Sequence, residues 1–324
     1  MNLPDTTAEP VKADRKATLI GWQGLTVRVP KDWSFAAYSG DAKSGYFRVE
    51  SPASEALEVK WSEQKGRPLL RRVLGDFRKR LFKDAKRSKL SVEFAEKPRP
   101  LSQLRFRGAA PITFRWKTNR TAYGALWYCE ECRRVTLAQV VGTASQTLGP
   151  LAFDILSSIE DHPAGDKLVW SVYDFTFQAP KDMLLEKHQL QSGHILMELQ
   201  NKRDKLVVER WGLANLILKR DTPSGWLSGA LYPHLKPFKY TKDEEAVHIQ
   251  GHAAVVFRGR MSGIRWLTVR LKAYTALRRP MDRVFGYGWH CPESNRVFAA
   301  LAMSHSAERA ENLASSVVES ISCH

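Results

Sequence analysis

The chain of 324 residues carries 50 lysines and arginines against 34 aspartates and glutamates, which leaves a formal net charge of +16. No run of about 18 apolar residues occurs in it, so we expect no membrane span. Its start lacks a charged-then-apolar signal segment, and we therefore expect a cytoplasmic protein with reduced cysteines.

Residues 1–16 are polar, contain prolines and show no periodicity, which predicts a disordered segment. An internal duplication organises the rest, because residues 127–135 and 289–297 share Trp, Cys, Glu, Arg and Val without a gap. Shorter matches precede them in the same order: 29–32 with 179–182, 57–61 with 207–211, 108–110 with 251–253, and 114–115 with 257–258. We predict a first domain over 17–162 and a second over 163–324, each large enough to bury its own core.

Strands are predicted where apolar and polar residues alternate, or where β-branched and aromatic residues gather. In the first half these runs cover 25–29, 57–61 and 135–141. In the second half they cover 168–175, 195–199, 205–211 and 264–274. The segment from Cys129 to Cys132 falls between two such runs, which indicates a hairpin turn.

The clearest helix is predicted over 68–87, where Pro68 suits the first helical position. Its apolar residues recur at helical spacing and form one stripe, which consists of Leu69, Leu70, Val73, Leu74, Phe77, Leu81 and Phe82. A weaker helix is predicted over 226–232 in the second half. Each half is predicted to end with a further helix, over 150–159 in the first half and 306–321 in the second.

Each half therefore combines three features: a strand end such as the Val-Pro-Lys-Asp at 29–32, a mid-domain helix, and a terminal helix after a Val/Ala-rich strand. This order, which covers most of each half, resembles the PsbP-like superfamily, which includes Ran-binding Mog-type proteins. The resemblance implies an α+β fold of two tandem repeats, each an antiparallel sheet with a mid-domain helix and a C-terminal helix packed on it. The two halves would then imitate a two-fold dimer within one chain. The superfamily hosts unrelated binding roles, so the resemblance implies no particular function.

Positive charge concentrates over 65–89, and on the helix predicted over 68–87 the basic residues fall mainly off the apolar stripe. The bases of this outer face include Arg71, Arg72, Arg78, Lys79, Lys83 and Lys86. One interpretation is a solvated face that keeps a basic protein soluble. The alternative is sequence-independent binding of nucleic acid or another polyanion, with an affinity that falls as salt rises.

The four cysteines allow several interpretations; they are Cys129, Cys132, Cys291 and Cys323. Cys129 and Cys132 form a Cys-x-x-Cys, which is half of a possible zinc site, but Ser294 stands where the second pair would repeat. The favoured interpretation is that Cys129 and Cys291 are small buried residues beside Trp127 and Trp289. A redox or disulfide role is the alternative, and no metal is predicted.

Glu131 with Arg134, and Glu293 with Arg296, repeat at the same spacing in both halves. The favoured interpretation is an ion pair that closes a hairpin. The alternative is a ligand site present in each half, where the arginine would clamp a carboxylate or phosphate. The residues that match between the two halves form either a ligand site or a structural pair. They are Trp127, Cys129, Glu131 and Arg134 in the first half, and Trp289, Cys291, Glu293 and Arg296 in the second.

No catalytic or cofactor motif occurs in the chain. His248 and His252 would share one face of a strand, but no third ligand is recognisable. We therefore predict no catalytic residues, no cofactor and no metal. The favoured function is a non-catalytic binding or scaffold protein that contacts a macromolecular partner. Polyanion binding through 68–87 is the alternative, and an enzyme with a site at the inter-domain cleft is the third possibility.

Overall fold

The computed structural model describes residues 17–107, 109–143, 148–263, 266–267 and 280–324. Its described residues fall into two compact units, the first of residues 17–20 with 26–161 and the second of residues 21–25 with 162–324. The prediction for residues 1–16 lies outside the described residues, as does most of the strand predicted over 264–274.

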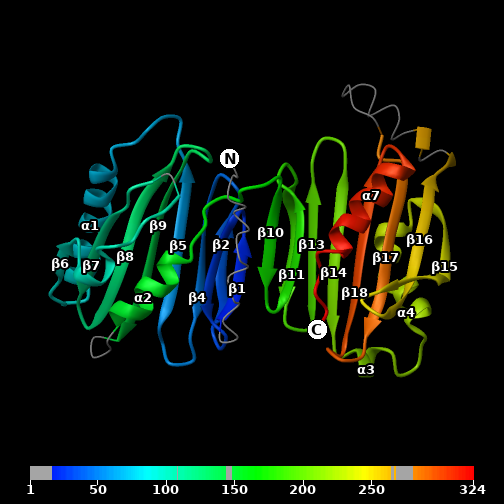
Figure 1. The fold of residues 1–324 in the computed structure, drawn as a ribbon, viewed down its shortest axis with the longest axis horizontal. Helices are drawn as coiled ribbons and strands as arrows, with labels where there is room; N and C mark the ends of the chain where they lie inside the picture. The colour runs from blue at the N-terminus through cyan, green and yellow to red at the C-terminus, as the bar shows by residue number, and fades with distance from the viewer. Residues whose placement is uncertain (1–16, 108, 144–147, 264–265, 268–279) are drawn as a thin grey trace, which may run out of the picture. The chain divides into compact units, whose positions relative to one another are not determined.

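The first unit is built on a seven-stranded antiparallel sheet with the order β3-β4-β5-β9-β8-β7-β6 (Figure 1). Before it in the chain come β1 (Ala17–Trp22) and β2 (Leu25–Pro30). The strands of the sheet are β3 (Ser34–Gly40), β4 (Ser44–Glu50), β5 (Ala56–Glu63), β6 (Glu93–Glu96), β7 (Ile112–Lys117), β8 (Arg120–Cys129) and β9 (Arg134–Thr143). Two α-helices accompany it: α1 (Leu70–Arg87) lies between β5 and β6 in the chain, and α2 (Leu148–Ser157) follows β9.

The second unit repeats this plan with a seven-stranded sheet of order β12-β13-β14-β18-β17-β16-β15. Its strands are β12 (Leu184–Gln191), β13 (His194–Gln200), β14 (Lys205–Gly212), β15 (Phe238–Ile249), β16 (His252–Met261), β17 (Arg283–Cys291) and β18 (Arg296–Ser304). The described helices are α3 (Ala214–Ile217), α4 (Pro223–Ala230), α5 (Tyr232–Leu235) and α7 (Ala307–Val318). A third sheet of four strands contains β10 (Lys167–Val172) and β11 (Phe175–Pro180), and Gly21 of β1 pairs with Ser171 of β10.

The predicted α+β class is wrong, because antiparallel strands in three sheets dominate the described chain and make the protein β-rich. The edge strands β3 and β12 were not predicted, because their mostly exposed side chains give no clear alternation. The bounds of the helices also differ from those predicted. The helix predicted over 226–232 is divided between α4 and α5, and Pro233 disfavours a continuous helix through this point.

Helix α1 is shorter, and its apolar stripe narrower, than predicted. It begins at Leu70, two residues after Pro68, and Leu69 is left 77% exposed. Phe82 is 38% exposed, and the guanidinium of Arg78 lies 5.3 Å from the centre of its ring. The side chains that pack against the sheet are Leu70, Val73, Leu74, Phe77 and Leu81.

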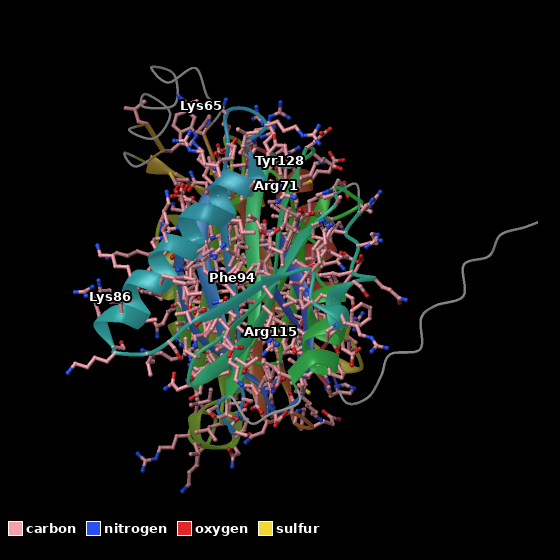
Figure 2. The ribbon with its side chains drawn as sticks, turned by 90° about the vertical axis from the view of Figure 1, so that its left-hand side faces the viewer. Lys65, Arg71, Lys86, Phe94, Arg115 and Tyr128 are labelled. Carbon is pink, nitrogen blue, oxygen red and sulfur yellow. The ribbon has the colours of Figure 1, made fainter. Side chains whose placement is uncertain are left out.

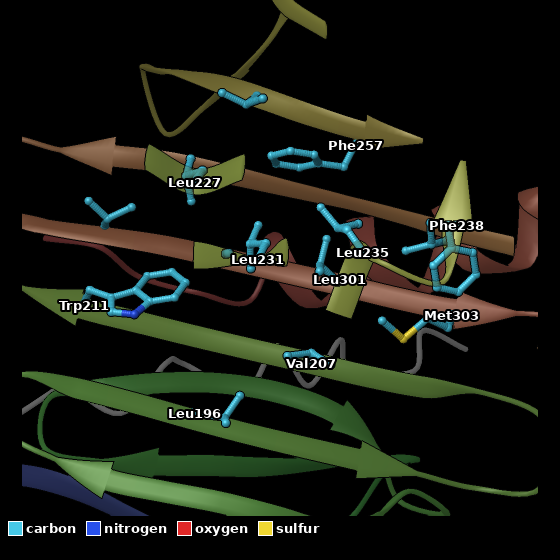
Figure 3. Packing of buried hydrophobic residues seen from close by; sticks show 14 of the residues in the cluster. Leu196, Val207, Trp211, Leu227, Leu231, Leu235, Phe238, Phe257, Leu301 and Met303 are labelled. Carbon is cyan, nitrogen blue, oxygen red and sulfur yellow. The ribbon is translucent and has the colours of Figure 1, made fainter. Parts of the chain in front are cut away.

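Helices cover both faces of each large sheet because buried residues alternate along the strands. In the second unit, Phe257 and Leu301 face a cluster that includes Leu227 of α4 and Leu235 of α5 (Figure 3). The neighbouring Val256 faces the other side, where alanines of α7 pack. In the first unit, α1 covers the face of Leu126, while α2 packs on the opposite face of β8 and β9.

Strand pairing corrects one of the predicted repeat matches. Thr136 in β9 pairs with Trp61, whereas its repeat equivalent Phe298 in β18 pairs with Arg210. Arg210 therefore occupies the place of Trp61, and the predicted match of these two strands is wrong by one residue. A one-residue shift reverses the face of every side chain. Trp211, the predicted counterpart of Trp61, accordingly packs in the cluster under α4.

Substitution of Gly124 by alanine is expected to destabilise the first unit by about 1–3 kcal/mol, since it overpacks a full core. A Cβ atom there would lie 2.3 Å from Cζ of the buried Phe114 and 3.0 Å from the carbonyl oxygen of Ala138. Urea unfolding followed by circular dichroism measures the change. In the control Gly75→Ala, on α1, the new Cβ meets no atom within 4 Å. That variant should gain up to about 1 kcal/mol, and equal losses in both variants would contradict the packing argument.

Candidate functional site

The basic residues predicted to face outward from 68–87 are all exposed on α1. They are Arg71, Arg72, Arg78, Lys79, Lys83 and Lys86, and Arg80 and Arg87 of the same helix are exposed as well. Figure 2 shows α1 with Arg71 and Lys86 towards its two ends. We call these eight side chains the α1 basic surface.

Few carboxylates oppose the α1 basic surface. The guanidinium of Arg71 lies 3.4 Å from the Glu96 carboxylate, and the ammonium of Lys79 lies 3.9 Å from Asp76. Among the described residues, no other base of this surface forms an ion pair. The surface therefore carries a positive charge that the protein itself largely leaves uncompensated.

A pocket of about 420 Å³ lies between α1 and the sheet of the first unit. Its floor is a hydrogen-bonded chain in which Trp116 Nε1 donates to Gln139 Oε1 at 3.0 Å, and Gln139 Nε2 donates to Glu58 Oε2 at 2.9 Å. Apolar side chains of α1 form the opposite wall, including Val73, Phe77 and Leu81. Charged side chains also line the pocket, including Lys60, Arg80 and Asp84, so its lining is mixed polar and apolar.

The repeated tryptophans are core residues in both units. Trp127 and Trp289 are fully buried, and their rings stack on Phe106 and Phe298 at 4.0 and 5.2 Å between ring centres. Neither presents a face to a ligand. The tryptophans thus anchor the ends of β8 and β17, next to the repeated cysteines Cys129 and Cys291, which are also buried.

The repeated glutamates and arginines flank the hairpin turns, as predicted for the turn after Cys129. In the second unit, however, they have separate partners. The carboxylate of Glu293 lies 3.6 Å from His252 Nε2, and Arg296 Nη1 donates to the carbonyl oxygen of Asp174 at 3.2 Å. In the first unit, Glu131 is exposed and Arg134 is partly buried. The ion pair predicted between Glu293 and Arg296 is therefore wrong.

The second unit contains a cluster of potential metal ligands that was not predicted from the sequence. It consists of His252, Cys291, Cys323 and His324, whose ligand atoms all lie within 4.8 Å of one another. We call it the Cys2His2 cluster. His252 was considered only with His248, and Cys323 was assigned no role. The repeat itself held the missing signal, because residues 323–324 stand where Asp161 and His162 stand in the first half.

The equivalent place in the first unit holds a second cluster, of Cys129, Cys132 and Asp161. Burial, together with the charge of Asp161, raises the pKa of the Cys132 thiol to about 12. A thiol with so high a pKa is a poor nucleophile at neutral pH, because the thiolate is the reactive form. Cys132 thus lacks the low pKa that a reactive cysteine has.

A buried carboxylate in the second unit lies between two imidazoles. Glu209 is 4% exposed in its side chain, and its oxygens lie 2.6 Å from His194 Nε2 and 3.2 Å from His234 Nε2. Burial would raise the pKa of Glu209, but the two histidines outweigh it, so the pKa is lowered. The ring of His194 stacks on Trp211 at 5.2 Å, and the group is enclosed by packing against the core.

No protein-family model and no curated protein matches the chain. Among solved structures, an alignment with isotype 1 transferrin binding protein B from serogroup B Neisseria meningitidis shows 7% identity and a TM-score of 0.12. It covers 89% of this chain and 58% of that one, which is less than two thirds of the matched protein. A TM-score this low carries no argument about fold or function.

Among the residues that the structure describes, no helix is both long enough and apolar enough to cross a membrane.

Proposed function

We propose that this protein is a non-catalytic binding protein whose α1 basic surface contacts a polyanion, with nucleic acid bound through its phosphates irrespective of sequence. The observation that carries the proposal is the exposed and largely uncompensated charge of α1. The predicted PsbP-like resemblance, the cytoplasmic location and the cleft enzyme remain predictions on which this proposal does not depend.

The repeat offers an internal comparison that supports the proposal. In the second unit, the segment between β14 and β15 covers the same face of the sheet with α3, α4 and α5, but it carries only three lysines and arginines, which are Lys219, Arg220 and Lys236. The fold therefore does not require a strongly basic helix in this place. A charge that packing does not require is a candidate for binding.

The shape of the α1 basic surface suits a phosphate backbone. At a rise of about 1.5 Å per residue, this helix of 18 residues extends over about 27 Å, which is the length of about eight base pairs of duplex. Helix α1 offers few exposed aromatic side chains that could stack on bases. Phe77 packs against the core, and the guanidinium of Arg78 lies over the ring of Phe82. Contacts to phosphates fix no base sequence.

Charge reversal tests the proposal. In the variant Arg71→Glu/Arg72→Glu/Arg78→Glu/Lys79→Glu, binding of fluorescein-labelled single- and double-stranded oligonucleotides is measured by anisotropy across a salt series. The wild type should bind with an affinity that falls steeply with salt. If all four residues contact phosphates, the variant should lose about three to four from the slope of log affinity against log salt for duplex.

A matched control reverses four exposed bases of the second unit with the same change in net charge: Lys202, Arg203, Lys219 and Arg220. This control should retain most of the affinity and most of the salt slope. Equal losses in both variants would show that only the overall charge matters, and would contradict a site on α1. Oligonucleotide binding absent at physiological salt would also overturn the proposal and redirect the search to a protein partner.

A further inference from the structure

The Cys2His2 cluster joins three segments that are far apart in the sequence. His252 is the first residue of β16, Cys291 is the last residue of β17, and Cys323 and His324 follow α7. Because β16 and β17 are paired and antiparallel, the first two residues lie at the same end of the sheet. The segment after α7 brings the other two ligands to that end, and all four ligand atoms then lie within 4.8 Å of one another.

Two sulfur–nitrogen distances within the cluster are close to those of a tetrahedral zinc site. The sulfur of Cys291 lies 3.6 Å from His324 Nδ1, and the sulfur of Cys323 lies 3.2 Å from the same nitrogen. In tetrahedral zinc, with Zn–S of about 2.3 Å and Zn–N of about 2.0 Å, sulfur and nitrogen are about 3.5 Å apart. The protein thus holds these donors at nearly the required separation.

His252 supplies a second, independent observation. Its side chain is only 10% exposed, and its Nε2 atom forms no hydrogen bond among the described residues. Buried polar atoms are normally paired, so an imidazole left in this state beside two thiols indicates a ligand position. The Glu293 carboxylate lies 3.6 Å from the same nitrogen, beyond hydrogen-bond distance.

Local hydrogen bonds hold the two cysteines in place. The backbone N–H of Ser294, in the β17–β18 turn, donates to Cys291 Sγ at 3.5 Å. Gln250, in the β15–β16 turn, accepts through Oε1 from the backbone N–H of Cys323 at 3.1 Å and from its thiol at 2.9 Å. The segment after α7 is therefore fastened to the β15–β16 turn beside the cluster.

We propose that the Cys2His2 cluster binds one Zn²⁺ ion in a structural site. Two thiolates and two imidazoles form a complete tetrahedral donor set, which leaves no open position for a substrate. The ion would tie the segment after α7 to the ends of β16 and β17. Binding releases the thiol protons to solvent as the thiolates ligate the metal.

Among the described residues, the equivalent cluster of the first unit lacks a complete set of four such ligands. Ala109 stands at the place of His252, so the equivalent cluster has no corresponding imidazole. Its carboxylate, on Asp161, already accepts a hydrogen bond from Trp127 Nε1 at 2.8 Å. The cluster of the first unit thus provides a natural control of similar burial and thiol content.

Titration with Co²⁺ tests the proposal directly. The fully reduced full-length protein, freed of metal by a chelator, should take up one equivalent of Co²⁺. It should show the visible bands of tetrahedral cobalt and a thiolate-to-cobalt charge-transfer band. One equivalent of Zn²⁺ should then displace the cobalt. The double variant Cys291→Ser/Cys323→Ser should lose these bands, whereas Cys129→Ser/Cys132→Ser should retain them.

The variant His252→Ala removes one ligand and should still fold, because the first half carries alanine at this position. It should keep the circular dichroism of the metal-free wild type and lose at least about tenfold in Zn²⁺ affinity. Zinc should raise the melting temperature of the wild type more than that of this variant. No uptake by the reduced wild type, or full uptake by the variant Cys291→Ser/Cys323→Ser, would overturn the proposal.

Discussion

Replacement of Arg309 by alanine is expected to lower the unfolding free energy of the second unit by about 3–5 kcal/mol. The guanidinium of Arg309, on α7, donates two hydrogen bonds to Asp204, from Nε to Oδ1 at 2.8 Å and from Nη2 to Oδ2 at 2.6 Å. Asp204 is 4% exposed in its side chain, and it also accepts from the buried Ser304 hydroxyl at 2.7 Å. Loss of the guanidinium would leave this carboxylate buried without a counter-charge.

Substitution of Asp204, the partner of Arg309, should have a smaller effect. Comparison of the two variants therefore tests the burial argument. In Asp204→Asn the side chain stays neutral and can still accept from Ser304, while Arg309, 43% exposed, can turn to water. We expect a loss of about 1–3 kcal/mol for this variant, and the double variant should be more stable than Arg309→Ala alone. Urea unfolding measures all three. If Arg309→Ala were the milder of the two single substitutions, the burial argument would be wrong.

The pH dependence of the same pair has a definite sign. Burial would raise the pKa of Asp204, but the hydrogen bonds from Arg309 and Ser304 outweigh it and the pKa is lowered. A carboxyl group with a lowered pKa in the folded state adds stability above its unfolded pKa of about 3.9, and loses it as the pH falls through the folded pKa. The difference in stability between the wild type and Arg309→Ala should therefore shrink below about pH 4.

Features encoded in consecutive residues were predicted correctly from the sequence. The turn after Cys129 was predicted because a strand pattern lies directly on either side of it. The exposed bases of α1 followed from helical spacing within 18 consecutive residues. Both signals lie in a continuous stretch of chain, where periodicity alone indicates which side chains face outward.

The features that were missed depend on pairing between distant segments. Trp61 and Trp211 seemed equivalent because each ends a similar run, and only the pairing with β9 and β18 shows that they lie on opposite faces. The Cys2His2 cluster needs β16, β17 and the residues after α7 to meet at one place. No spacing rule joins His252 to Cys323, and the register of the sheet decides the contact.

The double replacement His194→Ala/His234→Ala is expected to destabilise the second unit by about 3–5 kcal/mol, because it leaves the Glu209 carboxylate buried without the two imidazoles that contact it. Both imidazoles lie within 3.2 Å of its oxygens, and the strand that carries it is covered by α4 and α5. His194 also stacks on Trp211, so part of the loss is packing. The fluorescence of Trp211 and Trp226, whose rings lie 5.0 Å apart, should report the unfolding in urea.

A triple variant separates charge from packing at the same place. Adding Glu209→Gln to the two alanines removes the buried charge and leaves the lost stacking on Trp211 unchanged. An unpaired neutral amide costs about 1–3 kcal/mol, so the triple variant should recover part of the stability of the double variant. Because the folded pKa of Glu209 is lowered, the wild type should lose the stability that this carboxylate adds as the pH falls below the unfolded pKa of about 4.3. A triple variant no more stable than the double one would show that the histidines stabilise the unit by packing alone, and that the carboxylate needs no counter-charge.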